Sequence, residues 1–276
     1  MRVALAQLDS GSDRSANIEV IERDLADAAR LGAEILLLPE ACAFRGAFGP
    51  ELPESDSGPA LSAIRAAAAA HQVAVLVGGL WMHSGEAARP YNSAVFIDEA
   101  GQVLGTYRKV HLFRIDDGAV REDEAACTTA GDELVTVTWR DMVFGLSICY
   151  DLRFPELYRA LAAAGANVLC VPANFSAHTG RDHWSPLLRA RAIENLCYVV
   201  APAQTGVAPD GFAAYGHTMV VDPWGRVRAH AGRAPGLVLA ELSGKAIAER
   251  RAALNSPAQI RPDVYARAVR REGGHG

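Results

Sequence analysis

The chain has few cysteines, and they are not arranged as a disulfide framework or as metal ligands. Its 276 residues include five, which are far apart and contain no C-x-x-C pair. An odd, scattered set argues against disulfide staples and zinc knuckles. We therefore expect no metal and a reducing, cytoplasmic location. The five are Cys42, Cys127, Cys149, Cys170 and Cys197.

Several other sequence features are missing. No apolar run approaches the roughly 20 residues of a membrane span. The formal net charge is −5, with Lys and Arg scattered rather than clustered, which argues against a nucleic-acid partner or a polybasic membrane anchor. The chain has no Walker A sequence, no glycine-rich dinucleotide fingerprint and no G-x-S-x-G nucleophile elbow. We therefore expect no cofactor, no nucleic acid and no membrane contact.

The chain does have a large apolar fraction. Hydrophobic residues make up 50% of the sequence, which is ample for one large core in a chain of this length. No linker, low-complexity segment or internal repeat divides it, so we predict a single domain over residues 1–276. The stretch from about Asn255 is polar, and we expect it to form an extended C-terminal arm.

The apolar residues follow two periods along the chain. Ile18, Ile21, Leu25 and Ala28 are spaced as on one helix face, whereas 35–38 is a continuous apolar run typical of a buried strand. Hairpins are interleaved with helices, so we predict an α/β protein with mixed sheets, arranged as a four-layer α-β-β-α sandwich. The predicted strands are 3–8, 35–38, 73–80, 93–98, 103–108, 134–139, 142–148, 168–171, 197–201, 218–221, 227–228 and 237–242, and the predicted helices are 17–31, 58–71, 155–164, 185–195 and 246–254.

Three of the predicted strands lead into a reactive side chain, namely Glu40, Lys109 and Cys149. Ligand sites gather at the carboxyl ends of strands in α/β sheets. A thiol there can attack a carbonyl or nitrile carbon, and a carboxylate can move protons. An ammonium can stabilise the oxyanion and lower the thiol pKa. The combination indicates an acyl-transfer site.

Each of these residues also has an ordinary structural explanation. Glu40 could be a solvated loop carboxylate, and Lys109 could protect an edge strand against aggregation. Cys149 could be a small hydrophobe in the core. The shared position at strand ends favours the common site over three separate structural roles.

These residues lie in three short motifs, LLLPE at 36–40, YRKVHLF at 107–113 and ICYDLRFPE at 148–156. In these motifs the chain resembles the nitrilase superfamily, the carbon–nitrogen hydrolases. The resemblance implies that Glu40 is the general base, Lys109 stabilises the transition state and Cys149 is the nucleophile. The family also uses a second glutamate between the lysine and the cysteine, for which the chain offers Glu124 and, as an alternative, Glu122.

The resemblance carries further expectations. It supports the α-β-β-α sandwich and implies a homodimer or higher homo-oligomer. Segments 172–175, 189–195 and 215–225 are similar to the Nit branch, whose amidases act on deaminated glutathione and on ω-amides of 2-oxo acids. We therefore expect a small carboxamide substrate, cleaved to a carboxylate and ammonia through a Cys thioester.

Three more residues are substrate-binding candidates. The backbone N–H of Tyr150 would help to hold the oxyanion, and Asn174 follows a strand at the same sheet edge. Arg181 could bind a substrate carboxylate, although it could equally be a solvated loop residue. Arg153 is a weaker candidate because Glu156, three residues on, could pair with it.

Other functions remain open at this point. A carbamoylase, a nitrilase or an aliphatic amidase would use the same fold and triad, because pocket shape sets specificity. A non-catalytic binding protein on this scaffold is disfavoured because all three triad residues are present. A nicotinamide-dependent dehydrogenase is disfavoured because the chain has no glycine-rich phosphate loop.

Overall fold

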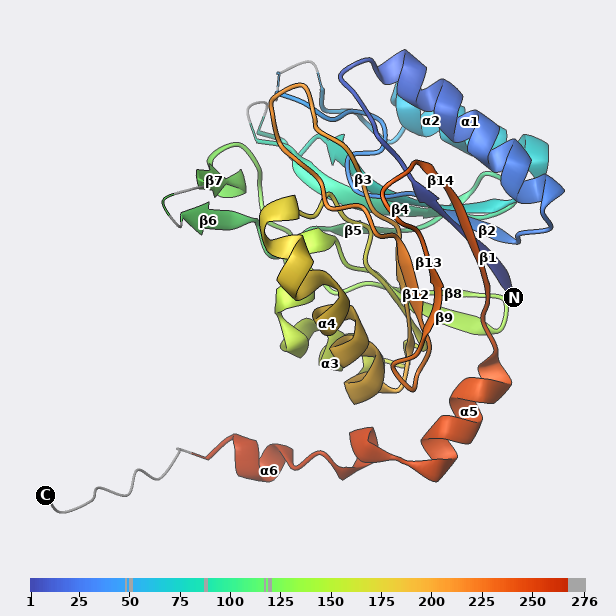
Figure 1. The fold of residues 1–276 in the computed structure, drawn as a ribbon, viewed down its shortest axis with the longest axis vertical. Helices are drawn as coiled ribbons and strands as arrows, with labels where there is room; N and C mark the ends of the chain where they lie inside the picture. The colour runs from blue at the N-terminus through green and yellow to red at the C-terminus, as the bar shows by residue number, and fades with distance from the viewer. Residues whose placement is uncertain (48, 50–51, 87–88, 117, 119–120, 268–276) are drawn as a thin grey trace, which may run out of the picture.

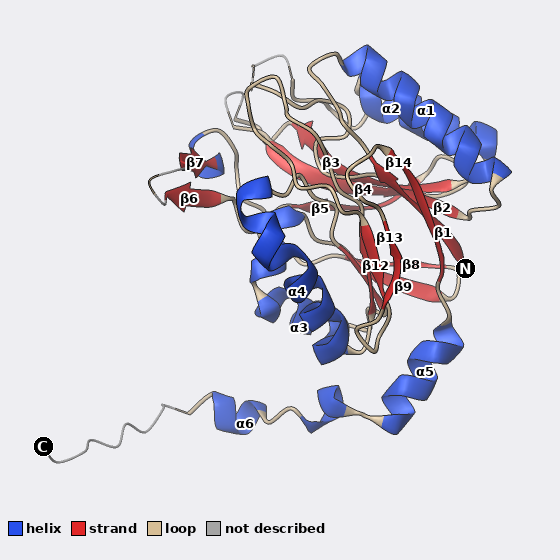
Figure 2. Cartoon of the chain, viewed as in Figure 1, coloured by secondary structure: helices blue, strands red, loops and turns tan. Residues whose placement is uncertain are grey.

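The computed structural model describes residues 1–47, 49, 52–86, 89–116, 118 and 121–267. Two six-stranded sheets pack against each other, with strand orders β14-β1-β2-β3-β4-β5 and β13-β12-β11-β10-β9-β8. Helices α1 and α2 cover the first sheet, and α3 and α4 cover the second (Figures 1 and 2). This arrangement confirms the predicted α-β-β-α sandwich with mixed sheets.

The elements have the following bounds. The strands are β1 Arg2–Gln7, β2 Ile35–Leu37, β3 Ala74–Met82, β4 Tyr91–Ile97, β5 Val103–Arg108, β6 Arg114–Asp116, β7 Arg121–Asp123, β8 Thr136–Trp139, β9 Met142–Gly145, β10 Val168–Cys170, β11 Tyr198–Ala201, β12 Met219–Val221, β13 Val227–His230 and β14 Gly236–Glu241. The α-helices are α1 Arg14–Arg30, α2 Pro59–His71, α3 Pro155–Ala163, α4 Ala177–Asn195, α5 Gly244–Ala253 and α6 Pro262–Tyr265, and the 3-10 helices are η1 Glu124–Ala126, η2 Cys149–Arg153 and η3 Ser256–Gln259.

Strand β2 shows why the layers form. Successive side chains of a strand point to opposite faces, so Ile35 and Leu37 pack into the core between the sheets. Leu36 lies on the other face, in the cluster that contains Ile21 and Leu25 of α1. Burying each such side chain stabilises the fold by about 1.5–3 kcal/mol. An apolar strand that is buried on both faces thus brings its carboxyl end to the interior edge of the sandwich.

Helix α4 begins earlier than the sequence predicted. We expected it to span only 185–195. It starts at Ala177 instead, and Pro186 lies inside it. The hydroxyl of Ser176 accepts a hydrogen bond from the backbone N–H of His178 and caps the helix. The predicted start was wrong because the Ser176 cap satisfies a free N–H group of the first turn, so the helix begins there.

The hairpin of β6 and β7 was not predicted. Its register pairs Arg114 with Asp123 and Asp116 with Arg121. Both strands are short and charged, so they have no alternation of apolar and polar residues by which a strand can be recognised. The hairpin leads directly into η1, which carries one of the two candidate second glutamates.

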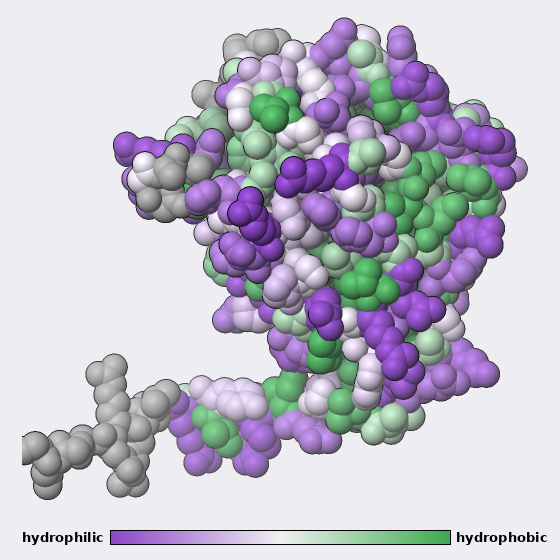
Figure 3. Space-filling view, in the orientation of Figure 1, coloured by the Kyte–Doolittle hydropathy of each residue, from purple (hydrophilic) through white to green (hydrophobic). Residues whose placement is uncertain are grey.

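The C-terminal arm leaves the body after α5 (Figure 1). It is not uniformly extended as predicted, because η3 and α6 interrupt it. Figure 3 shows hydrophilic and hydrophobic side chains mixed along it, and Tyr265 is 69% exposed. Residues 268–276 of the predicted arm lie outside the described residues. None of the helices in the described ranges has the length and apolarity needed to cross a membrane.

Candidate active site

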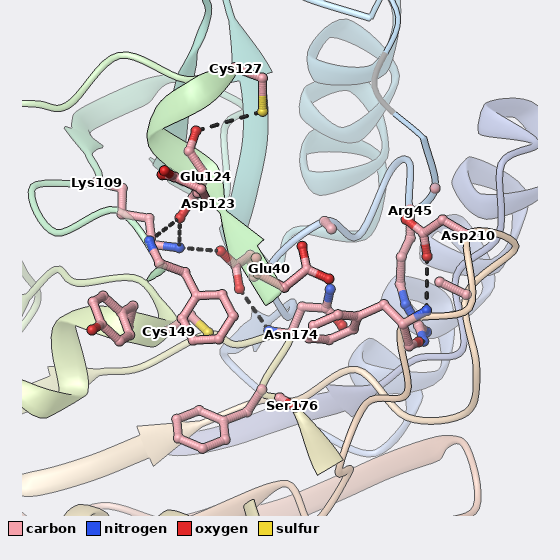
Figure 4. A pocket seen from close by; sticks show the side chains of 18 of the residues that line it. Glu40, Arg45, Lys109, Asp123, Glu124, Cys127, Cys149, Asn174, Ser176 and Asp210 are labelled. Atoms are coloured by element: carbon pink, nitrogen blue, oxygen red, sulfur yellow. Dashed lines mark hydrogen bonds and ion pairs between the residues drawn. The ribbon is translucent and has the colours of Figure 1, made fainter. Parts of the chain in front are cut away.

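The structure brings the three strand-end residues into one cavity of about 300 Å³ (Figure 4). Glu40 follows β2, Lys109 directly follows β5, and Cys149 is the first residue of η2, shortly after β9. The three strands come from both sheets. Their carboxyl ends converge at the cavity, as the position of the residues in the sequence predicted.

Lys109 lies between two carboxylates. Its Nζ is 2.9 Å from Oε1 of Glu40 and 2.8 Å from Oε2 of Glu124. The side chain of Lys109 is only 2% exposed, and that of Glu40 is also buried. Asn92, on β4, donates its side-chain N–H groups to both carboxylates, at 2.9 Å and 3.2 Å. These four side chains form one hydrogen-bonded cluster at the wall of the cavity.

Asn92 was missed at the level of sequence. The sequence does contain an indication of its role, because Asn92 is a polar residue at the start of the apolar strand β4. In the structure its side chain is buried. Buried polar side chains in strands are hydrogen-bonded as a rule, so an amide there indicates a polar partner inside the protein. What the sequence could not reveal is that the partners are Glu40 and Glu124.

Burial and charge act in opposite directions on the pKa values of this cluster. Burial by itself would raise the pKa of Glu40, but the charge and hydrogen bond of Lys109, with hydrogen bonds from Asn174 N–H and from Cys149, hold that pKa below its usual value. Burial would lower the pKa of Lys109, but Glu124 and Glu40 raise it well above its usual value. Glu40 is therefore an anion and Lys109 a cation at neutral pH.

The pKa of Cys149 is shifted upwards, whereas we expected Lys109 to lower it. Burial and the negative charge of Glu40 raise it well above the usual value, and Lys109 offsets only part of this effect. The prediction of a lowered thiol pKa is thus wrong for the resting site. Cys149 is a neutral thiol that is hydrogen-bonded to the carboxylate of Glu40. This arrangement is suited to removal of the thiol proton by Glu40 during attack.

A buried carboxylate holds the turn that presents Cys149. The φ of Cys149 is +49°, a left-handed conformation that costs a residue other than glycine about 1–2 kcal/mol. Asp151 Oδ2 accepts hydrogen bonds from Ile148 N–H at 2.8 Å and from the hydroxyl of Tyr107 at 2.7 Å. Its Oδ1 accepts one from His111 N–H at 3.1 Å. Asp151 thereby connects the cysteine turn to the lysine segment.

The structure places only one of the two candidate second glutamates against Lys109. Besides its contact with Nζ, Glu124 Oε2 accepts a hydrogen bond from Phe113 N–H at 2.7 Å. Glu122 is exposed on β7. It lines the cavity without an ion pair to Lys109. Glu124 is therefore the glutamate positioned to act together with Glu40 and Lys109.

Two of the predicted substrate-binding residues also line the cavity. Asn174 donates its backbone N–H to Oε2 of Glu40 at 2.8 Å. Tyr150 lies next to the nucleophile. In the part of the chain that the structure describes, no protein acceptor is recorded for the backbone N–H of Tyr150. That N–H can therefore serve an oxyanion on a substrate bound at Cys149.

The cavity contains a different arginine from the one we favoured. Arg181 is exposed on α4 and is not part of the cavity lining, because the segment that we expected to be a loop is helical. Arg153 lines the cavity. Its guanidinium is 3.2 Å from both Thr179 Oγ1 and His183 Nδ1 and lies 5.4 Å from the ring centroid of Phe175.

The structure gives no indication of a metal site within the described residues. No group of three or more His, Cys, Asp or Glu side chains lies close enough together there to hold a metal ion. All five cysteines are free thiols. The chemistry that the cluster around Cys149 offers is that of a thiol, the carboxylates of Glu40 and Glu124, the ammonium of Lys109 and backbone N–H groups.

Known proteins are similar to this chain in both sequence and fold. The family model for carbon-nitrogen hydrolase matches residues 2–252. A deaminated glutathione amidase from Synechocystis is 44% identical over 250 residues, which are 87% of this chain and 90% of that protein. The crystal structure of the Caenorhabditis elegans NitFhit protein matches with a TM-score of 0.89 and 35% identity, over 96% of this chain and 66% of that longer chain.

A second solved structure agrees with the first. Nit3 of Saccharomyces cerevisiae, described as a member of branch 10 of the nitrilase superfamily, has a TM-score of 0.82 and 27% identity over 92% of this chain and 94% of its own. These matches confirm the resemblance that three short motifs indicated. The chain belongs to the carbon–nitrogen hydrolase family and is an amidase, an enzyme that hydrolyses a carbon–nitrogen amide bond.

Proposed function

We propose that this amidase works through a thioester on Cys149, with Glu40 as general base and Lys109 as electrostatic stabiliser. The observation that carries the proposal is the buried Lys109 ammonium, held between Glu40 and Glu124 beside the thiol. A buried charge is costly unless it is paired. A site that keeps an ammonium, a carboxylate and a thiol together in a cavity is suited to acyl transfer.

The proposed steps follow from the charges. Glu40 takes the thiol proton as the sulfur attacks the amide carbon, and the resulting oxyanion is held by Lys109 and the Tyr150 N–H. Glu40 then gives the proton to the leaving nitrogen, and the amine departs from the thioester. In the second half, Glu40 takes a proton from water as the water oxygen attacks the thioester carbon. The carbon–sulfur bond then breaks, Glu40 returns the proton to the Cys149 sulfur, and the acid product leaves as a carboxylate after losing its own proton to solvent or to the released amine. Glu124 keeps Lys109 charged and in place.

We propose an anionic amide of the deaminated-glutathione or 2-oxo acid type as the substrate. The Synechocystis relative is named for deaminated glutathione. Arg153 supports an anionic substrate, because its guanidinium lines the cavity. Its recorded polar contacts are the neutral hydroxyl of Thr179 and the ring of His183. A substrate carboxylate would be a stronger partner for this partly buried guanidinium than either of these neutral groups, and no described residue forms an ion pair with it.

The test compares two arginines on two amides. We expect Arg153→Gln to lower kcat/KM for an anionic 2-oxo amide by about 10- to 150-fold, the equivalent of a hydrogen bond to a charged group at 1.5–3 kcal/mol. A neutral amide of similar size should lose much less. Arg181→Ala is the matched control, and we expect it to change neither substrate by more than about twofold, since Arg181 is exposed outside the cavity.

Three outcomes would contradict the proposed substrate. Equal losses on both amides in Arg153→Gln would mean that Arg153 supports the cavity wall rather than a substrate carboxylate. A wild type that prefers the neutral amide would indicate a simple aliphatic amidase. Carbon dioxide released together with ammonia from a carbamoyl compound would indicate a carbamoylase.

We also propose that the chain is a single domain, is located in a reducing cytoplasm and forms a homodimer. Five free cysteines support the reducing location. The arm and exposed apolar side chains, among them Tyr265 and Leu254, support self-association. Light scattering at micromolar concentration should give twice the mass of 29.3 kDa. A monomeric mass would refute the dimer.

A further inference from the structure

The cavity extends past the catalytic cluster. In Figure 4, Lys109 and Cys149 lie on one side of Glu40, and Arg45 and Asp210 lie on the other. All of them line the same cavity of about 300 Å³. A minimal primary amide, whose leaving group is ammonia, would leave the part beyond Glu40 unoccupied by substrate.

A short hairpin, residues 207–213, forms the wall at that far end. Val207 and Ala213 pair through an antiparallel bridge, and Ala208 N–H donates to Phe212 O at 2.9 Å. Ala208 and Phe212 face each other on the two arms of the hairpin, and Asp210 lies in the turn between them. All three line the cavity.

Arg45 fixes this hairpin to the body of the protein. It is only 2% exposed, and its guanidinium donates to Thr205 O at 2.6 Å, to Gly206 O at 3.1 Å and to Phe212 O at 3.3 Å. Asp9 pairs with it at 3.2 Å. The backbone of Gly206 packs closely against the carboxylate of Asp9, and a Cβ at this position would clash with it. Gly206 also has a φ of +70°, which favours glycine.

The position of the proton donor Glu40 indicates what this end of the cavity binds. In the proposed function, on which this inference rests, Glu40 gives a proton to the leaving nitrogen. The leaving nitrogen therefore lies beside Glu40, and the cavity continues from there towards the 207–213 hairpin, where an amine part bonded to that nitrogen has room. We propose that this hairpin is the leaving-group subsite, and that Arg45 is the residue that positions it.

The experiment compares two amides of one 2-oxo dicarboxylic acid. One is the primary amide, which releases ammonia, and the other carries a dipeptide on its amide nitrogen. In Arg45→Met, we expect kcat/KM for the dipeptide amide to fall at least tenfold more than for the primary amide, mainly through KM. Arg45→Lys, which keeps a donor and the charge, should recover part of the loss. Phe212→Ala, which changes a half-buried side chain of the hairpin, should shift the ratio in the same direction.

Arg65→Met is the matched control, because Arg65 also donates to a backbone carbonyl, that of Gly101, without lining the cavity. It should leave the ratio of the two amides unchanged. If Arg45→Met and Phe212→Ala both leave this ratio as in the wild type, the hairpin is not a leaving-group subsite, and the inference is overturned while the proposed function stands. A wild type that hydrolyses neither amide would overturn both.

Discussion

Replacing Cys149 with alanine is expected to abolish amide hydrolysis, with kcat reduced by at least about 10⁴-fold. Losses on the order of 10⁴–10⁶ are typical when the nucleophile of a covalent mechanism is removed. Cys149 is the only thiol that is hydrogen-bonded to Glu40 among the described residues, so its removal takes away the sulfur whose proton Glu40 is placed to accept. The variant should still fold, because a small side chain replaces a small side chain in a rigid turn.

The thioester can be observed directly by intact-mass spectrometry. The wild type, mixed with substrate and quenched with acid, should gain the mass of the acyl group, and Cys149→Ala should not. Cys127 is the matched control, since it also lines the cavity and is only partly buried. Cys127→Ala should form the adduct as the wild type does. An adduct that persists in Cys149→Ala would show that the nucleophile has been assigned to the wrong residue.

The fold could be predicted from the sequence because its signals are local. The run at 35–38 and the hairpins each depend on a few neighbouring residues, and these positions determined where Glu40, Lys109 and Cys149 fall. The carboxyl ends of buried strands meet at a sheet edge. For this reason, three side chains far apart in the sequence could be assigned to one site before the structure was considered.

The parts that could not be predicted depend on distant contacts. Asn92 bridges Glu40 and Glu124 only because β4 lies beside them in space. The pKa of Cys149 depends on burial and on the charge of Glu40, neither of which a local pattern contains. Arg153 rather than Arg181 lines the cavity, because the segment after Ser176 folds as a helix and not as the loop that we expected. Side-chain environment, rather than element position, was thus the missing information.

Lys109→Met is expected to lower kcat by about 10²–10³-fold while the protein remains folded. Loss of one oxyanion donor typically has an effect of this size, and methionine fills a similar volume in the buried site. A second effect follows from the charges. Without the ammonium, burial and the nearby Glu124 would raise the pKa of Glu40, because two buried carboxylates without a cation share a proton.

This second effect gives Lys109→Met a distinctive pH dependence. In the wild type, the pKa of Glu40 is held low, so its carboxylate is ionised throughout the neutral range. In the variant, Glu40 would be protonated near neutrality and could not take the thiol proton. The residual kcat/KM should therefore rise with pH over a range in which the wild type is flat. The control is Lys245→Met, since Lys245 is exposed on α5, and it should match the wild type in both rate and profile. Near-normal turnover in a folded Lys109→Met, or a loss without any shift of the acid limb, would mean that the ammonium does not control Glu40.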